Sequence, residues 1–165
     1  MQNTKITDYG NIKILEFNKM LEFENKVKLA VALKTYNNGF SRLKNLDINN
    51  NKFENIAKVL NVKPTDILLA KQEHTDNITV ITENNSYTLD NTDGIITNLK
   101  NIPTAITFAD CTPLFFYDPI KNVIANIHSG WKGTVQEIGA RAVEKLKSIY
   151  ECKTENLLCF IGPCI

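Results

Sequence analysis

The sequence predicts an α/β fold in which a mixed β-sheet is flanked by helices. Short apolar segments with the pattern of strands recur along the chain, and two further segments have helical periodicity. Residues 105–110 and 123–128 are almost continuously apolar, as in strands that are covered on both faces. With 165 residues and a hydrophobic fraction of 43%, the chain can bury a substantial core. We therefore expect residues 1–165 to form a single domain.

The first part of the chain is predicted to contain two strands, a loop and a short helix. Residues 11–17 and 26–34 alternate apolar with polar side chains, which is typical of strands. Residues 35–51 are rich in asparagine and include a glycine, so they are predicted as a loop. A helix is expected near 51–61, where apolar side chains recur at helical spacing before a proline: Phe53, Ile56, Ala57, Leu60 and Pro64.

The second part is predicted to supply the core strands and the main helix. The strands are expected at 66–70, 77–82, 105–109, 122–127 and 157–161, and residues 86–98 are expected to form a turn that enters another strand. The helix is expected near 134–150, because five apolar side chains fall on one stripe: Val135, Ile138, Ala142, Leu146 and Ile149. The last strand reaches a Gly-Pro turn just before Ile165. This ending indicates a domain that is incomplete at its C-terminus, and the alternative is a domain whose last strand lies at a sheet edge.

The charge balance argues against nucleic acid and membrane surfaces as partners. The formal net charge is +1, which gives no long-range field to recruit a polyanion, so a small ligand is the easier partner. No apolar run approaches the roughly 20 residues of a membrane span, and the N-terminus lacks the pattern of a secretion signal. We therefore expect a cytoplasmic protein. Its four cysteines should stay reduced and form no disulfide: Cys111, Cys152, Cys159 and Cys164.

Three residues form a candidate set of metal ligands. His74, Cys111 and His128 are each expected just after an apolar strand, where side chains from different strands converge at one edge of a sheet. Two imidazoles and one thiolate, with a fourth position left open, suit a catalytic zinc ion. The alternative is that the histidines are solvated or hydrogen-bonded residues and the cysteine is a small core residue.

The stretch "HSGWKGT", residues 128–134, suggests a second kind of site. Its two glycines and Lys132 precede the predicted helix, where backbone amides and a cation can hold an anion. The alternative is a tight connection between strand and helix, capped by Thr134, with Trp131 packed on the core.

Several stretches together resemble the laccase-domain family of YfiH-type bacterial proteins. The signature segments are "FADCTPLFFYDP" (108–119), "IANIHSGWKGT" (124–134) and "FIGPCI" (160–165). Upstream, "KQEHTDNITV", "TDGIITN" and "NGFSR" resemble further segments of the family. The resemblance runs from about Asn38 onward. It implies a YfiH/CNF1-like α/β fold from which roughly the last third of the family domain is absent.

The resemblance also implies roles for individual residues. The zinc ligands of the family fall on His74, Cys111 and His128, which are the three residues proposed above. Cys111, His128 and Asp110 are the implied catalytic residues, whereas Arg42 and Lys132 would bind substrate. Asp93 and Asp110 are candidates for orienting a ligand or transferring a proton.

The chain departs from the family pattern at three places. Thr75 replaces the glycine that usually follows the first histidine, the loop after Arg42 lacks a pair of glycines, and the family continues beyond Ile165. A piece of the family domain on its own is therefore expected to fold poorly or to be inactive.

The implied function is that of a zinc-dependent purine nucleoside phosphorylase. It would act with phosphate on adenosine, inosine and S-methyl-5′-thioadenosine, and it would also deaminate adenosine, as a monomer or homodimer. One alternative is a copper-dependent polyphenol oxidoreductase, although two histidines are few for several copper centres. Another is a cysteine hydrolase or deamidase with Cys111 as nucleophile and His128 as base. A binding domain without enzymatic activity is the last alternative.

Overall fold

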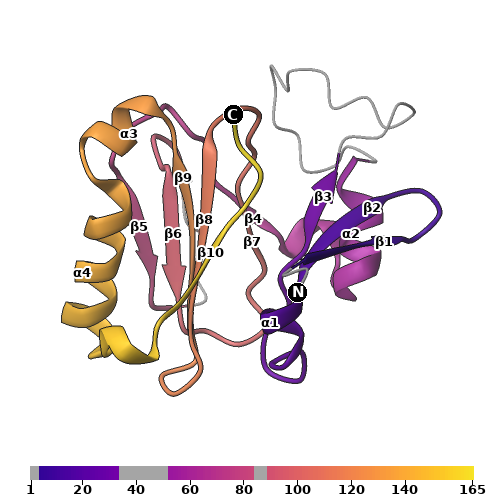
Figure 1. The fold of residues 1–165 in the computed structure, drawn as a ribbon, viewed down its shortest axis with the longest axis horizontal. Helices are drawn as coiled ribbons and strands as arrows, with labels where there is room; N and C mark the ends of the chain where they lie inside the picture. Colours follow the sequence, from indigo (N-terminus) through magenta and orange to yellow (C-terminus); the bar gives the residue numbers. More distant parts are fainter. Residues whose placement is uncertain (1–3, 34–51, 84–88) are drawn as a thin grey trace. The chain divides into compact units, whose positions relative to one another are not determined.

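The structure confirms an α/β fold with a mixed sheet and flanking helices (Figure 1). It is a computed structural model that describes residues 4–33, 52–83 and 89–165. The chain divides into two compact units, Met1–Ile67 and Leu68–Ile165, so the expectation of a single domain stays a prediction. Among the described residues, no helix combines the length and the apolar character that a membrane crossing requires.

The first unit contains a three-stranded antiparallel sheet in the order β1-β2-β3. Its elements are β1 (Thr4–Asp8), β2 (Lys13–Phe17), α1 (Asn18–Leu21), β3 (Val31–Leu33), α2 (Lys52–Leu60) and a 3₁₀ helix (Pro64–Asp66). The predicted strands and helix are confirmed, with shorter bounds. Strand β1 escaped prediction because its residues are mostly polar and partly exposed, so they carry no apolar pattern.

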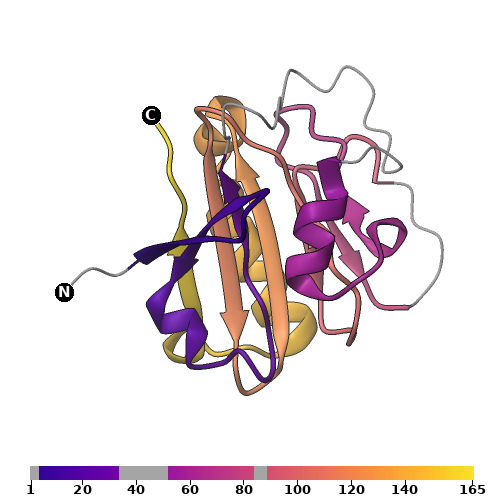
Figure 2. The ribbon, with the colours of Figure 1, turned by 90° about the vertical axis from the view of Figure 1, so that its right-hand side faces the viewer.

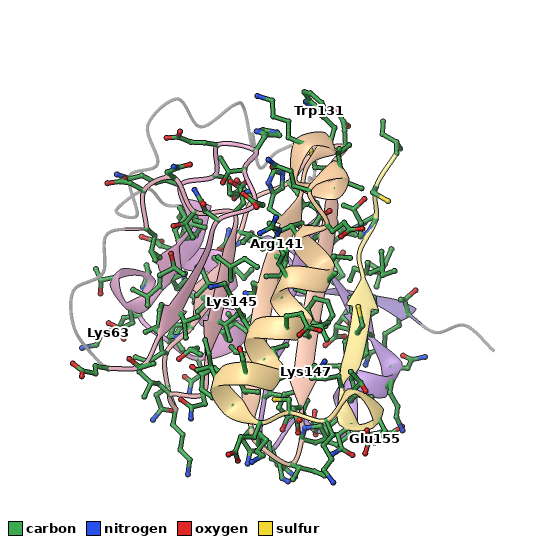
Figure 3. The ribbon with its side chains drawn as sticks, turned by 90° about the vertical axis from the view of Figure 1, so that its left-hand side faces the viewer. Lys63, Trp131, Arg141, Lys145, Lys147 and Glu155 are labelled. Atoms are coloured by element: carbon green, nitrogen blue, oxygen red, sulfur yellow. The ribbon has the colours of Figure 1, made fainter. Side chains whose placement is uncertain are left out.

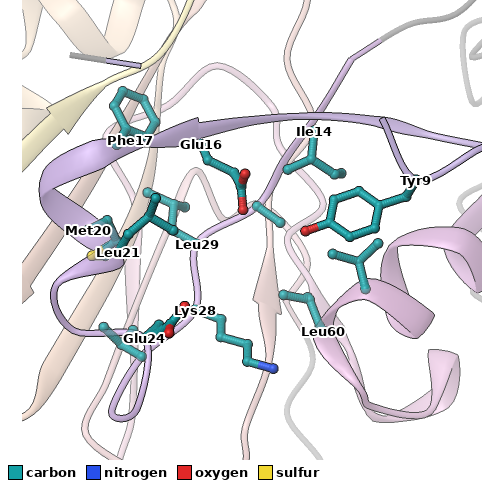
Figure 4. Close-up of a pocket in the computed structure, with 13 residues that line it drawn as sticks. Tyr9, Ile14, Glu16, Phe17, Met20, Leu21, Glu24, Lys28, Leu29 and Leu60 are labelled. Atoms are coloured by element: carbon teal, nitrogen blue, oxygen red, sulfur yellow. The ribbon is translucent and has the colours of Figure 1, made fainter. Parts of the chain in front are cut away.

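A cavity of about 170 Å³ lies within the first unit. Most of the residues that line it are apolar, and Tyr9 and Glu16 turn their oxygen atoms toward its interior (Figure 4). The Glu16 carboxylate also accepts a hydrogen bond from the Thr7 hydroxyl and pairs with Lys5 at 3.5 Å. Its charge is therefore compensated within the unit. The cavity contains none of the residues that the sequence analysis selected as functional.

The second unit is built on a five-stranded sheet in the order β10-β8-β9-β6-β5. Its elements are β4 (Leu68–Leu69), β5 (Ile78–Ile81), β6 (Gly94–Thr97), β7 (Thr104–Ala105), β8 (Thr112–Asp118), β9 (Val123–Ser129), α3 (Trp131–Val135), α4 (Ile138–Tyr150), a 3₁₀ helix (Thr154–Asn156) and β10 (Leu158–Ile161). Only β5 and β6 pair in parallel within this sheet. The beginnings of β5, β6 and β8 therefore lie at the same end of the sheet as the end of β9 (Figure 1 and Figure 2).

Helix α4 covers one face of this sheet. Ile138, Ala142 and Leu146 are completely buried and pack in one cluster with sheet residues such as Ile96 and Ile127. Burying an isoleucine or leucine side chain stabilises a fold by about 1.5–3 kcal/mol, so this stripe fixes the helix on the sheet. The opposite side of α4 carries charged residues, including the exposed Arg141 and Lys147 (Figure 3).

The predicted continuous helix over 134–150 is wrong at its beginning. Glu137 has a φ of 59°, in the left-handed region, and it separates α3 from α4. Val135 consequently lies on α3 and is 76% exposed, and Ile149, near the end of α4, is 46% exposed. The apolar periodicity runs across the break in the backbone, so it could not reveal where the helix is interrupted.

Two of the predicted core strands are much shorter than expected. The segments 66–70 and 105–109 contribute only to β4 and β7, which form a separate two-residue parallel pair. The segments 122–127 and 157–161 contribute to β9 and β10 as predicted. Strand β8, which was not predicted as a strand, lies between them and pairs with both.

Candidate metal centre

The structure brings His74, Cys111 and His128 together in the second unit. One ligand atom from each side chain lies within 4.8 Å of the others. The Cys111 Sγ atom lies 3.8 Å from His74 Nε2. The two imidazole rings meet nearly edge to face, with centroids 4.9 Å apart and an interplanar angle of 82°. The ligand set proposed from sequence therefore forms one compact group.

The strands place these residues differently from the prediction. Only His74 lies after a strand, in the connection between β4 and β5, whereas Cys111 directly precedes β8 and His128 lies inside β9. Because β8 and β9 are antiparallel, the beginning of one meets the end of the other, and Thr112 pairs with Ser129. The β8–β9 hairpin therefore brings Cys111 and His128 together. The sequence analysis expected instead that each residue would follow the end of a different strand.

The site is open on one side. His128 is only 3% exposed, Cys111 is partly buried and His74 is exposed. The buried imidazole is anchored in the sheet, and the exposed one lies at the surface. A small molecule can therefore reach this group from the His74 side.

Asp93 connects two of the three candidate ligands. Its Oδ1 atom lies 2.8 Å from His128 Nδ1 and accepts a hydrogen bond from the His74 amide at 3.1 Å. Its Oδ2 atom accepts bonds from the Thr75 amide and hydroxyl, both at 2.8 Å, and from the Glu73 amide at 3.2 Å. The carboxylate is completely buried, at the residue before β6. A single side chain therefore holds both the His128 ring and the loop that carries His74.

These contacts determine the charge state of Asp93. Burial raises its pKa, but the hydrogen bonds from Thr75, His128 and Glu73 outweigh burial and hold the pKa below its ordinary value. An ionised carboxylate can only accept hydrogen bonds, so His128 Nδ1 donates to it. The lone pair of the His128 ring then remains on Nε2, as a metal ligand requires.

His74 has a backbone conformation that is unusual for its residue type. Its φ is 60°, in the left-handed region, where a residue with a Cβ atom is destabilised by about 1–2 kcal/mol. The hydrogen bonds from the amides of Glu73, His74 and Thr75 to Asp93 hold the loop in this conformation. Thr75, one of the departures from the pattern that the family resemblance implies, adds a hydroxyl bond to the same carboxylate. The departure at this position therefore strengthens the loop.

Gln72 was not selected from sequence, yet its side chain ties the His74 loop to the segment before Cys111. Its amide nitrogen donates to the Thr107 carbonyl at 2.6 Å, and its carbonyl oxygen accepts from the Thr107 amide at 2.7 Å. The Gln72 side chain thus bonds to both backbone polar groups of Thr107, as a neighbouring strand would, and this links the two loops. In the sequence, Gln72 is marked only by its place in "KQEHTDNITV", one of the segments that resemble the family.

Gly130 allows the chain after β9 to pass close to both imidazoles. A Cβ atom at this position would lie 2.7 Å from His74 Cδ2 and 3.3 Å from His128 Cε1. The first distance is shorter than carbon atoms tolerate, so any larger residue would displace the His74 ring. Gly130, the first glycine of "HSGWKGT", therefore leaves the space that the two imidazole rings occupy.

The remaining predicted site residues are less closely tied to this group. Lys132 is exposed, and its Nζ atom lies 5.6 Å from the centroid of the Trp131 ring. Trp131 is 69% exposed, so the alternative in which it packs on the core is wrong. Asp110 is exposed beside Cys111 and has a φ of 75°. Arg42 lies outside the described residues.

The environment of Cys111 bears on its possible role as a nucleophile. Burial raises the pKa of the thiol, and the negative charges of Asp110 and Asp93 raise it further. The contact of Asp93 with His128 Nδ1 leaves Nε2 of that ring available, so the raised pKa of the thiol is the observation that counts against the nucleophile. Because a cysteine nucleophile needs a lowered pKa, the raised pKa of Cys111 gives the hydrolase alternative little support.

Comparisons with known proteins identify the family of the chain. A family model described as multi-copper polyphenol oxidoreductase laccase matches residues 30–165. The chain is 36% identical over 130 residues to the purine nucleoside phosphorylase YlmD of Bacillus subtilis (strain 168), covering 74% of this chain and 46% of that protein. It is 32% identical over 153 residues to a purine nucleoside phosphorylase of Clostridium acetobutylicum, covering 93% of this chain and 63% of that one.

Solved structures show the same fold. The crystal structure of the hypothetical protein YfiH of Bacillus licheniformis matches with a TM-score of 0.76 and 25% identity, covering 95% of this chain and 66% of that one. The structure of YlmD from Geobacillus stearothermophilus matches with a TM-score of 0.64, covering 70% of this chain and 46% of that one. The present chain thus spans 46% and 63% of the two curated relatives described above.

Proposed function

This chain belongs to the family described as multi-copper polyphenol oxidoreductase laccase, and we propose that the protein it comes from is a zinc-dependent purine nucleoside phosphorylase. The main support is the convergence of His74, Cys111 and His128 at one end of the sheet. Two relatives that align with most of this chain carry the name purine nucleoside phosphorylase. The proposed substrates are phosphate with adenosine, inosine or S-methyl-5′-thioadenosine, and adenosine deamination is a second proposed reaction.

The three side chains fit a zinc ion by their chemistry and their spacing. Zinc in catalytic sites takes three protein ligands of nitrogen and sulfur type and leaves a fourth position free. With ordinary bond lengths, two ligands of a tetrahedral zinc ion lie roughly 3.3–3.6 Å apart. The Cys111 Sγ and His74 Nε2 atoms are 3.8 Å apart, close to that separation, and all three ligand atoms lie within 4.8 Å of one another, so the group closes by up to about 1 Å on binding. When bound, zinc would supply Lewis acidity to an oxygen atom of a substrate or of water.

The surrounding residues would prepare and protect this site. Asp93 keeps the proton of His128 on Nδ1 and fixes the loop of His74. Because Gly130 has no side chain, the backbone after β9 can pack closely against both imidazole rings. Neither residue needs to touch the substrate, because both act by positioning the imidazoles.

In phosphorolysis, an oxygen atom of phosphate forms a bond to C1′ of the ribose while the bond from C1′ to the purine nitrogen breaks. Lys132, and Arg42 on the segment outside the described residues, would bind the phosphate anion through charge-assisted hydrogen bonds. Asp110, exposed beside Cys111, would pass the proton that the attacking hydrogen phosphate loses to the leaving purine. The products are the free base and ribose 1-phosphate.

In deamination, water adds to C6 of adenosine and ammonia leaves. The proton that water loses and the proton that ammonia gains must be carried by a group in the site. Asp110 is the exposed carboxylate next to Cys111, so we assign it this transfer as well.

Copper chemistry is the second candidate, because the family description names it. Several copper centres require many imidazole ligands. The chain has two histidines, and both belong to the one candidate metal group found among residues 4–33, 52–83 and 89–165. The described part of the chain thus offers the ligands of one metal ion, for which we propose zinc.

The test measures hypoxanthine and ribose 1-phosphate formed from inosine and phosphate by the full-length protein, alongside metal analysis. His128→Ala should abolish both bound zinc and turnover. Asn126→Ala is the matched control, since it lies in the same strand and removes only hydrogen bonds to Thr104. If zinc-free His128→Ala protein still turned over inosine at the wild-type rate, the proposed function would be wrong. A copper-loaded sample assayed with a phenol would address the second candidate.

A further inference from the structure

Each pair among the three candidate ligands is held together by a different part of the structure. Cys111 and His128 are brought together by the β8–β9 hairpin, in which the beginning of β8 meets the end of β9. His128 and His74 are joined through Asp93, which contacts His128 Nδ1 and accepts the His74 amide. The third pair is His74 and Cys111, which lie on two separate connections, one after β4 and one after β7. The relative position of these two residues therefore needs a support of its own.

Strands β4 and β7 run in parallel toward the two connections. The Leu68 amide donates to the Pro103 carbonyl at 2.8 Å, and the Ala70 amide donates to the Ala105 carbonyl at 3.0 Å. In a parallel pair the donors of one strand recur at every second residue, so the next bond of this series would run from residue 72 to residue 107. A donor at residue 72 would thus extend the pairing toward both candidate ligands.

The side chain of Gln72 supplies this bond. Its amide nitrogen donates to the Thr107 carbonyl at 2.6 Å, and its oxygen accepts from the Thr107 amide at 2.7 Å and from the Thr107 hydroxyl at 3.2 Å. A backbone amide can only donate and a backbone carbonyl can only accept, so both ends of the Gln72 amide group are fixed by their partners. Gln72 lies two residues before His74, and Thr107 lies four residues before Cys111. The link is therefore close to both candidate ligands along the chain.

We infer that Gln72 is a positioning residue for the metal centre, which sets the distance between His74 and Cys111. Their Nε2 and Sγ atoms lie 3.8 Å apart, near the separation of two ligands of one zinc ion. Glutamine carries a donor and an acceptor on one planar group, whereas an ionised glutamate of the same length could only accept. The effect on zinc rests on the proposed function, whereas the placement of the two side chains does not.

The zinc affinity of the full-length protein, measured by competition with a chelator, tests the role in metal binding. Gln72→Met keeps the approximate size of the side chain and removes its hydrogen bonds. Zinc should then bind about tenfold more weakly, at the lower end of the loss that is typical when a residue that orients ligands is changed. Gln136→Met is the matched control, because Gln136 is exposed and the bonds described for it are made by its main chain. Equal affinities of the wild-type and Gln72→Met proteins would overturn the proposal.

A double-mutant cycle with His74→Ala separates positioning from a general weakening of the fold. If Gln72 acts by placing His74 against Cys111, its replacement should matter little once the His74 imidazole is absent. The tenfold loss should therefore shrink to about twofold or less in the His74→Ala background, because the effects of coupled residues are not additive. A loss of the same size in both backgrounds would show that Gln72 only supports the fold, and the positioning role would be wrong.

Crystal structures of the metal-free wild-type and Gln72→Met proteins test the placement without zinc. The Sγ atom of Cys111 and the Nε2 atom of His74 should lie further apart in the variant, while the β8–β9 hairpin keeps its register. An unchanged separation would refute the role of Gln72. If the wild-type protein bound no zinc, the proposed function would fail, and these two structures would still decide whether Gln72 positions the side chains. The two failures are therefore distinguishable.

Discussion

The Nδ1 atom of His128 lies 2.8 Å from Oδ1 of Asp93, and the backbone amide of His128 donates to the Asp93 carbonyl at 2.7 Å. Asp93 thus holds His128 through its side chain and through its main chain. The same carboxylate accepts the amides of residues 73–75, so two of the three candidate ligands depend on one residue. This dependence makes the group sensitive to changes at a position that is not itself a ligand.

Replacing Asp93 with asparagine should lower the affinity for zinc by about 10–100-fold, as is typical when a residue that orients a ligating histidine is changed. The amide has one oxygen acceptor where the carboxylate has two, so part of the hydrogen bonding from Thr75 or His128 is lost. Titration against a competing chelator measures the affinity. Asp90→Asn is the control, because Asp90 is exposed and pairs only with Lys71 among the ion pairs described. Unchanged affinity in Asp93→Asn would show that the carboxylate does not position the ligands.

Gly130→Ala should weaken metal binding and leave the sheet folded. The added Cβ atom would stand 2.7 Å from the His74 ring, which is exposed and can move away. Absorption of the cobalt-substituted protein reports the ligand geometry, and circular dichroism reports the fold. Gly139→Ala serves as the control, since its Cβ atom would meet only the flexible end of Leu114. A cobalt spectrum identical to that of the wild-type protein would contradict the expected displacement.

Alkylation of Cys111 separates a ligand from a nucleophile. With zinc bound, Cys111 should react far more slowly than in the metal-free protein, because the metal occupies its sulfur. The exposed residues Cys159 and Cys164 are internal references, because their alkylation rates should change less than that of Cys111 when zinc is added. Mass spectrometry of alkylated peptides gives each rate. Fast modification of Cys111 with zinc in place would support the cysteine hydrolase alternative.

Stability at alkaline pH should depend on Cys152. Burial, and then the neighbouring Asp118 carboxylate, raise the pKa of its thiol from 9.0 to about 12. Above pH 9 the unfolded chain releases this proton while the folded chain retains it, so the free energy of unfolding falls as the pH rises. The slope approaches about 1.4 kcal/mol per pH unit.

Denaturant unfolding of wild-type and Cys152→Ala proteins between pH 9.0 and 10.0 measures this slope. The range ends there because burial and Asp118 also raise the pKa of Tyr117, whose ordinary value is 10.0. The variant should be less stable overall, since a buried sulfur atom is lost, but its stability should vary less with pH. Parallel pH profiles for the two proteins would argue against a buried, protonated thiol.

The sequence predicted helices correctly where the apolar periodicity runs along a continuous helical backbone. The stripe of Ile138, Ala142 and Leu146 identified the main helix, and all three residues are buried. Val135 continues the same pattern but is exposed, because Glu137 takes a left-handed conformation that periodicity does not register. Strand β1 was missed for the opposite reason, since backbone pairing holds it in the sheet without an apolar pattern.

The members of the candidate site could be selected from sequence, but their support could not. Residue chemistry and the family resemblance both indicated His74, Cys111 and His128, and the structure groups them. The contacts made by Gln72 and Gly130 depend on how loops cross, which a linear pattern does not contain. Asp93 was suspected of orienting a ligand, and only its five hydrogen bonds show how it connects His128 with the His74 loop.

The order of the strands also implies an order of assembly during folding. Cys111 and His128 are brought together by the β8–β9 hairpin, whose turn is closed by Asp118 through the amides of Ile120 and Lys121. His74 arrives only when β5 pairs with β6 and β6 pairs with β9. Closing a short loop costs less entropy than joining distant segments, so the hairpin should form first. Pulse-labelled hydrogen exchange during refolding should therefore protect β8 and β9 before β5, and a half-formed site of one thiol and one imidazole would precede the complete one.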